Sequence, residues 1–177
     1  MSALPYVVRF VVPTALAVLE DLAAELGHTA AGKLDRADSR AMLIAIGLQE
    51  SRFTDRFQIR GPAHGFWQSE YGGGAWTGIL DHPQTREIAR ELLRRMAYGE
   101  PDIGDYKGVA HNDVLACCFA RLLLWTHPEA LPGQNEADAA WDYYESVWRP
   151  GKPHPETWLA FWHQAWVEVW RAQKVTG

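Results

Sequence analysis

The chain has 177 residues and a formal net charge of −5, with 17 Lys and Arg against 22 Asp and Glu. This acidic balance argues against a nucleic-acid-binding protein, because neutralising phosphates needs clustered Lys and Arg. The length suits one domain with a sizeable core, residues 1–177, and no Ser-, Gly- or Pro-rich linker divides it.

The N-terminal segment is apolar without resembling a targeting signal. Arg9 and Pro13 interrupt residues 4–19, and neither a Lys/Arg-rich start nor a small-residue cleavage site frames them. We therefore expect no host signal peptide and no stable membrane insertion. We expect instead an amphipathic helix with Pro13 in its first turn, running to about Leu26.

A buried helix is predicted from about Ser39 to Glu50, with Asp38 or Ser39 as its cap. Its apolar residues fall on most of its faces, which is typical of a helix surrounded by protein. Glu50 therefore leaves a hydrophobic wall near the negative end of the helix dipole. Partial desolvation and the dipole both raise the pKa of such a carboxyl group toward the range of a general acid. The alternative is a solvated carboxylate, which is common at helix ends.

A loop rich in glycine and aromatic residues follows, over residues 61–74. Its glycines permit sharp turns and a close approach to a ligand, and a flat ring such as Trp67 can stack on the C–H face of a sugar. The amide of Gln68 can bind a hydroxyl or N-acetyl group. The alternative is a structural loop whose aromatic side chains fill the core. A short hairpin within residues 57–76 is the only strand structure we expect.

The rest of the chain predicts further helices, so the fold class is mainly α. Their expected ranges are 83–98, Val114–Trp125 capped by Asn112 or Asp113, Ala137–Trp148, and about Pro155–Gln173. The last of them carries four tryptophans at a spacing of four. That stripe drifts around the helix, which favours core packing over a single groove. The adjacent cysteines, Cys117 and Cys118, are expected to be free core thiols.

Two spaced motifs resemble those of a known family. Glu50-Ser51-Arg52-Phe53 and the segment ending in Ala63-His64-Gly65-Phe66-Trp67-Gln68 resemble the E-S-x-F and G-A-x-G-L-M-Q motifs of lytic transglycosylases and of goose-type and phage lysozymes, which cleave the glycan strands of peptidoglycan. The resemblance implies a lysozyme-like fold. It also implies that Glu50 is the catalytic acid and that Ala63, Gly65, Trp67 and Gln68 belong to the substrate-binding motif.

A third family motif, A-Y-N, has no clear copy in this chain. The nearest segment, Cys118-Phe119-Ala120, lacks both the hydroxyl and the amide. Tyr143 or Tyr144 could supply the missing hydroxyl. The alternative is that these tyrosines pack a rigid turn that follows them.

The reaction type depends on a second carboxylate, for which Glu70 and Asp81 are candidates and Asp55 a weaker third. Hydrolytic glycosidases pair the acid with another Asp or Glu. A lytic transglycosylase needs only the acid, because the muramic acid 6-hydroxyl closes the ring. The weakened third motif slightly favours hydrolysis.

The resemblance therefore implies a phage or prophage enzyme that cleaves the MurNAc–GlcNAc bond. It would be made in the bacterial cytoplasm and would reach the cell wall through a holin or within a virion. A monomer is assumed, and no cofactor or metal is expected, since the histidines and cysteines show no ligand spacing. The alternative is a phage structural or wall-binding protein that kept a lysozyme-like fold without turnover.

Overall fold

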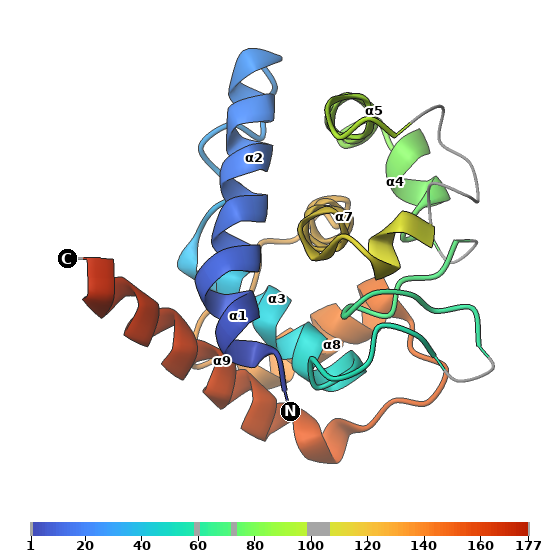
Figure 1. Cartoon of the computed structure of the whole chain (residues 1–177). Coiled ribbons are helices and arrows are strands. Elements are labelled where there is room, and N and C mark those ends of the chain that lie inside the picture. The colour runs from blue at the N-terminus through green and yellow to red at the C-terminus, as the bar shows by residue number, and fades with distance from the viewer. Residues whose placement is uncertain (1, 59–60, 72–73, 99–106, 177) are drawn as a thin grey trace.

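The computed structural model describes residues 2–58, 61–71, 74–98 and 107–176, and the chain is mainly helical, as predicted. Figure 1 shows α3 and α7 at the centre of the molecule, with α2, α5 and α9 around them. The predicted hairpin is reduced to two isolated antiparallel bridges, Phe57 with His64 and His64 with Ser69. Residues 59–60 and 72–73 of that segment lie outside the described residues. Within the described part of the chain, no helix is both long and apolar enough to cross a membrane.

The N-terminal helix begins earlier than predicted. It runs without interruption through α1 (Leu4–Tyr6), a π-helical turn η1 (Val7–Val11) and α2 (Val12–Glu25). Pro13 therefore lies inside a helical run rather than at its start. The π-turn explains this difference: the N–H of Val12 bonds to the carbonyl of Val7, five residues back, and this wider turn makes room for the proline ring that would clash in a regular α-helix.

Helix α3 (Ala37–Glu50) is buried over most of its length, as predicted. It begins two residues before Ser39, and its N-cap is Arg36 rather than Asp38 or Ser39. Ser39 instead occupies the third position of the helix, where its hydroxyl accepts from the Arg36 N–H at 2.9 Å. It therefore closes the helix start from inside the first turn, which is the role of the third residue in a capping box.

The segment predicted as one helix over residues 83–98 is shorter in the structure. Helix α4 (Thr77–Asp81) precedes it, and α5 (Arg86–Arg95) begins after a turn. The buried Thr85 fixes this turn, because its hydroxyl donates to the carbonyl oxygen of Ile79 at 2.7 Å. Helix α5 buries Ile88, Leu92 and Leu93 and exposes Arg86, Arg90, Arg94 and Arg95.

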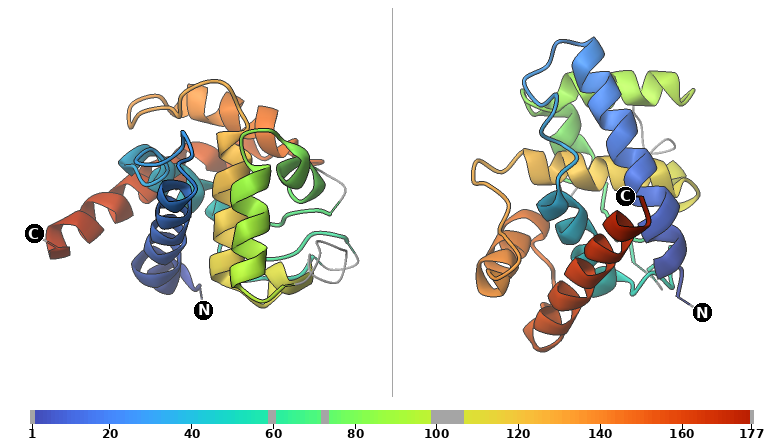
Figure 2. Two further views of the ribbon diagram at one scale, coloured as in Figure 1. Left: turned by 90° about the horizontal axis from the view of Figure 1, so that it is seen from above. Right: turned by 90° about the vertical axis from the view of Figure 1, so that its left-hand side faces the viewer.

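The remaining helices lie close to their predicted ranges. A 3₁₀ turn, η2 (Gly108–Ala110), leads into α7 (Asp113–Trp125), which is capped by Asn112. Helices α8 (Ala137–Trp148) and α9 (Pro155–Thr176) follow. Figure 2 shows α7 and α5 lying side by side and α9 crossing below α2.

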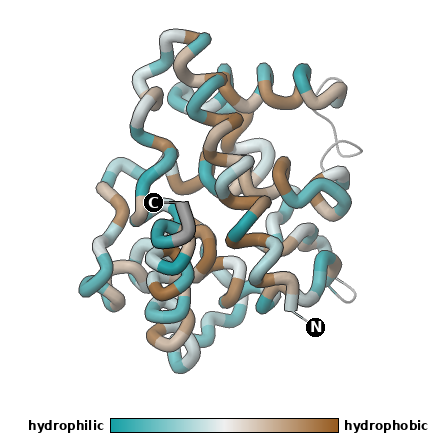
Figure 3. The backbone as a smooth tube through the Cα atoms, turned by 60° about the vertical axis from the view of Figure 1, so that its left-hand side comes forward, coloured by the Kyte–Doolittle hydropathy of each residue, from teal (hydrophilic) through white to brown (hydrophobic). Residues whose placement is uncertain are grey.

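The core lies where α7 packs against α2 and α3, and where α9 packs against α3. Figure 3 shows that hydrophobic residues recur along the helices between hydrophilic ones, and the core is formed by buried hydrophobic residues from these helices. Three tryptophans of α9 are buried as predicted, and Trp170 is 42% exposed because the stripe drifts around the helix. Both cysteines are buried and free, which confirms that prediction.

Candidate functional site

The C-terminal end of α3 presents Glu50 at the edge of the core. The chain folds back there, and the ring of Phe53 lies against Gly47, where an added Cβ would approach ring carbons to 2.2 Å. Ser51 fixes the fold-back, because its hydroxyl donates to the carbonyl oxygen of Phe66 at 2.7 Å and accepts from the N–H of Phe53 at 3.1 Å. The chain is thus turned away from Glu50, which is left partly buried against protein.

Three residues around Glu50 adopt left-handed backbone conformations that non-glycine residues rarely occupy. Their φ angles are 51° for Arg52, 53° for Phe53 and 45° for Gln68. N-terminal residues hold the first two, since the hydroxyl of Ser2 donates to the carbonyl oxygen of Arg52 at 2.9 Å and the N–H of Ala3 donates to that of Phe53 at 2.8 Å. Backbone strain of this kind costs free energy and is concentrated at functional sites in proteins.

Tyr144 on α8 contacts Glu50 directly. Its hydroxyl donates to Oε1 of Glu50 at 2.6 Å, and its ring is buried and stacks on Trp158 with the centroids 5.1 Å apart. The stacked ring has little freedom, so the hydroxyl is held toward the carboxyl group. Of the two tyrosines that the sequence left open, Tyr144 is therefore the one that brings a hydroxyl to Glu50.

Burial is the main cause that raises the pKa of Glu50, to about 7. The hydrogen bond from Tyr144 acts in the opposite direction, because it stabilises the ionised form, and the negative charge of Glu70 raises the pKa further. At neutral pH the carboxyl group is therefore divided between its protonated and ionised forms. A group in that state can both donate and accept a proton.

The two candidate second carboxylates differ in their relation to Glu50. Glu70 is exposed in the loop after Gln68, and it is close enough for its charge to act on Glu50. Asp81 is also exposed, but it is the last residue of α4. The electrostatic coupling to Glu50 singles out Glu70 as the stronger candidate.

The loop that carries Gln68 is tied to the rest of the fold at several points. Gly65 has a φ of 74°, and an added Cβ would lie 2.9 Å from the carbonyl oxygen of Val109. The carbonyl of Gly65 accepts from both the backbone N–H and the Nε2 of Gln68, at 3.0 and 2.8 Å. The side-chain nitrogen of Gln68 therefore helps to hold the loop together, and its amide oxygen can accept a hydrogen bond from a ligand. Ala63 is buried, and its carbonyl accepts from the N–H of Gln58 at 3.2 Å.

Two residues predicted to bind substrate are buried in the core. Trp67 is 0% exposed, and its indole N–H donates to the carbonyl oxygen of Leu43 in α3 at 2.9 Å. Its ring is therefore part of the core and cannot stack on a sugar. Tyr143 is also buried, and its hydroxyl donates to the carbonyl oxygen of Leu124 at 2.8 Å. Successive residues of a helix point about 100° apart, so Tyr143 faces away from Glu50 when Tyr144 faces it.

Trp148, at the end of α8, is a positioning residue that the sequence analysis missed. Its indole N–H donates to the carbonyl oxygen of Trp67 at 3.0 Å and so fixes the backbone just before Gln68. The same helix therefore supplies the tyrosine that contacts Glu50 and the tryptophan that holds the loop. Its place one turn after Tyr144 was the available signal, since side chains four residues apart share a helix face.

A cavity of about 550 Å³ lies at the opposite end of α3, near Arg36, Arg121 and Tyr143. Helix α3 has 14 residues and is therefore about 20 Å long, with Glu50 at its C-terminal end and the cavity residues Arg36 and Asp38 at its start. No group of three or more His, Cys, Asp or Glu among the described residues is arranged to hold a metal ion.

Comparisons of the chain with family models, with curated protein sequences and with solved structures find no match.

Proposed function

We propose that the protein is a glycosidase that cleaves the MurNAc–GlcNAc bond of peptidoglycan, with Glu50 as the general acid. One observation carries this proposal: the carboxyl group of Glu50 has a pKa near 7 at the end of a buried helix, and the hydroxyl of Tyr144 lies 2.6 Å away. A general acid works best when its pKa lies near the working pH. The choice of peptidoglycan rests on the two motifs around Glu50 and Gln68, and so does the proposal of a lysozyme-like fold encoded by a phage or prophage.

In the proposed reaction, Glu50 protonates the glycosidic oxygen as the bond to the anomeric carbon breaks. Tyr144 keeps the carboxyl group oriented, and it stabilises the carboxylate that remains after the proton has left. The amide oxygen of Gln68 accepts a hydrogen bond from the sugar. Glu70 then acts as general base and takes a proton from a water molecule, whose oxygen bonds to the anomeric carbon. The reaction is therefore hydrolysis, and the products carry a reducing end.

Zymography with purified sacculi tests whether the protein has this activity. The parent protein should clear the sacculi and Glu50→Gln should not, while Glu87→Gln, an exposed glutamate of α5, serves as the matched control. No clearing by the parent protein would overturn the proposal.

Mass spectrometry of the digested sacculi tests the type of reaction. Reducing-end muropeptides, lost in Glu70→Gln but retained in Asp81→Asn, would support Glu70 as the base. Anhydro products that persist in Glu70→Gln would show instead that Glu50 acts alone, as in a lytic transglycosylase.

A second candidate function is a non-catalytic phage protein that binds the cell wall. The observation that favours it is the position of the ligand-sized cavity, which lies away from Glu50. Such a protein would sediment with sacculi without clearing them. Its binding to sacculi would also be unchanged in Glu50→Gln. An enzyme would instead release cut fragments from the sacculi.

A further inference from the structure

The cavity at the start of α3 is formed by the loop before that helix, the C-terminal end of α7 and one side of α8. Lys33, Arg36, Arg121, Trp125 and Tyr143 contribute to its lining. Its volume of about 550 Å³ is within the range of sites that hold small organic ligands. It is separate from the Glu50 site, because the two lie at opposite ends of α3.

Arg121 is a buried cation without a carboxylate partner. It is only 2% exposed, and within the described part of the chain no Asp or Glu oxygen lies within ion-pair distance of it. Its Nε donates to the carbonyl oxygen of Leu34 at 2.9 Å, and its Nη2 donates to that of Lys33 at 3.3 Å. A guanidinium has five N–H groups, so most of its donor capacity is unused by these two bonds.

Burial lowers the pKa of Arg121 to about 10, so the guanidinium stays charged at neutral pH. A buried charge without a counter-ion is costly, because it has lost its hydration without gaining an ion pair. The ring of Trp125 offsets part of this cost, since the guanidinium carbon lies 5.3 Å from the ring centroid.

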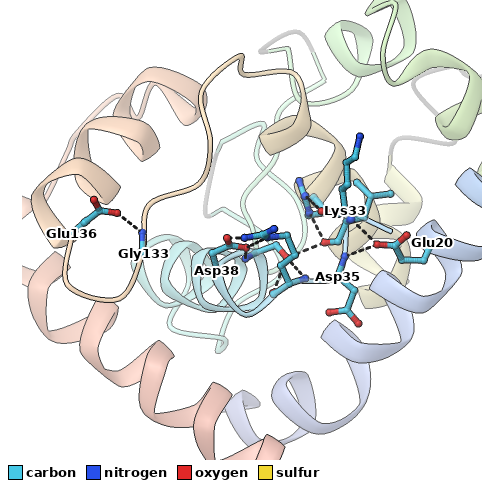
Figure 4. Close-up of polar contacts among 10 residues, drawn as sticks. Glu20, Lys33, Asp35, Asp38, Gly133 and Glu136 are labelled. Carbon is cyan, nitrogen blue, oxygen red and sulfur yellow. Dashed lines mark hydrogen bonds and ion pairs between the residues drawn. The ribbon is translucent and has the colours of Figure 1, made fainter. Parts of the chain in front are cut away.

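Three acidic residues act on Arg121 through their charge, and each of them has other partners; Figure 4 shows Glu20 bonded to the loop before α3. Glu20 accepts from the backbone N–H groups of Gly32, Leu34 and Asp35 at 2.5 to 2.8 Å. The other two acids form ion pairs, Asp35 with Arg40 at 2.6 Å and Asp38 with Arg36 at 3.1 Å. The charges of all three act on Arg121 from a distance, but none of the three forms an ion pair with it.

The remaining charges on the cavity wall leave it positive. Arg36 and Asp38 form an ion pair with each other. Lys33 is exposed and adds a second positive charge to that of Arg121, and Glu129 is the acid in the lining that forms no ion pair with the described residues. The aromatic ring of Trp125 and the side chains of Leu124 and Leu131 supply apolar surface beside these charges.

We propose that this cavity binds a small organic oxyanion, a carboxylate or a phosphate ester, whose charged group pairs with the guanidinium of Arg121. Carboxylates and phosphates match the planar fork of an arginine, which can bind both of their oxygens at once. Lys33 attracts the anion at the rim, and the apolar part of the ligand lies against Trp125. The proposal stands independently of any activity at Glu50.

Two probes of matched size test the need for a negative charge. N-acetylglycine carries a carboxylate, and N-acetylglycinamide replaces it with a neutral amide. We expect N-acetylglycine and inorganic phosphate to raise the melting temperature and to bind in isothermal titration, while the amide and sodium chloride at equal ionic strength do neither. The stronger of the two anions then identifies the carboxylate or the phosphate as the preferred group.

Three variants test whether the anion binds in the cavity. Arg121→Lys keeps the charge but loses the fork, and it should weaken binding by about tenfold or more. Lys33→Gln should weaken binding less. This variant should fold like the parent protein, because Arg121 is bonded to the backbone of Lys33 and not to its side chain. Arg9→Gln, which removes an exposed cation on η1, should leave the affinity unchanged.

The Arg121 side chain also provides a direct readout. Its Nε–H signal in a nitrogen-edited NMR spectrum, assigned by its loss in Arg121→Lys, should shift when the anion is added. If neither anion shifts this signal or stabilises the protein, the proposal is wrong and Arg121 serves only to hold the loop before α3. Equal binding to the parent and to Lys33→Gln and Arg121→Lys would also overturn it.

Discussion

The two ends of α3 each lie beside an ionisable group that has lost much of its hydration, and the two groups have opposite charges. At the C-terminal end burial raises the pKa of Glu50 from 4.5 to about 7, and at the N-terminal end burial lowers the pKa of Arg121 from 12.5 to about 10. The same physical effect thus gives different results at neutral pH. Glu50 becomes a group that exchanges its proton, whereas Arg121 remains a fixed charge. Proton transfer is suited to the first end and anion binding to the second.

The largest effect that we expect is the loss of activity in Glu50→Gln. Removing a general acid should lower the rate on sacculi by on the order of a hundredfold or more, and the circular dichroism spectrum should not change. Activity of this variant at the parent rate would show that the C-terminal end of α3 is not a catalytic site. The anion affinity of the cavity should be unaffected, because the two ends are about 20 Å apart.

The stability of the fold around Glu50 should depend strongly on the side chain of Trp67. Trp67→Ala removes a fully buried ring and its hydrogen bond to Leu43, and it should lower the free energy of unfolding by about 3–5 kcal/mol. Gln68→Ala should lower it much less, because that side chain is only partly buried. Trp170→Ala is the control for an exposed tryptophan. Equal losses in all three variants on chemical denaturation would contradict the buried position of Trp67.

The stability of the protein should depend on pH through Glu50. Its pKa is higher in the folded state than its ordinary value of 4.5, so the folded protein binds this proton more tightly than the unfolded chain. The resulting stabilisation is complete below pH 4.5 and is lost as the pH rises through 7. It amounts to at most about 3 kcal/mol. Urea denaturation at pH 5 and pH 8 measures this effect. Relative to the parent protein, Glu50→Gln should have a higher free energy of unfolding at pH 8 than at pH 5.

The smallest effect is a pair of opposite shifts in the pH profile of the activity. Tyr144→Phe removes a hydrogen bond that lowers the pKa of Glu50, so the basic limb of the profile should move to higher pH by about one unit. Glu70→Gln removes a charge that raises this pKa, so any residual activity should show that limb at lower pH. Asp81→Asn is the control and should leave the limb in place. Shifts of the same sign in the first two variants would show that the limb does not report Glu50.

Much of the fold could be predicted from the sequence, because most helices carry clear periodicity and end signals. Asn112 caps α7 as one of the two residues proposed for it, and α8 has the predicted bounds. The start of the N-terminal helix could not be predicted in this way. Proline at a first turn is the common case, whereas the π-turn that admits Pro13 depends on a local change in hydrogen bonding that residue preferences do not encode.

The candidate site was predictable only in part. The position of Glu50 follows from where the apolar helix ends, whereas the direction of Trp67 depends on how the loop folds over α3. The choice between Tyr143 and Tyr144 depends on the rotation of α8 about its axis, which the sequence left open. The cavity was missed altogether. Its signal was Arg121, a single charged residue within the otherwise apolar second half of α7.

The two buried cysteines make the protein a reporter of its own unfolding. Cys117 and Cys118 are both 0% exposed in the middle of α7, and burial raises the pKa of each thiol. Neither should therefore react with a maleimide while the protein is folded. The rate of thiol labelling therefore measures how often the core opens. A cysteine introduced at an exposed position can be labelled selectively in the native protein, without replacing the natural pair. Fluorescent or spin probes can thus be placed near Glu50 or near the cavity in an otherwise unaltered chain.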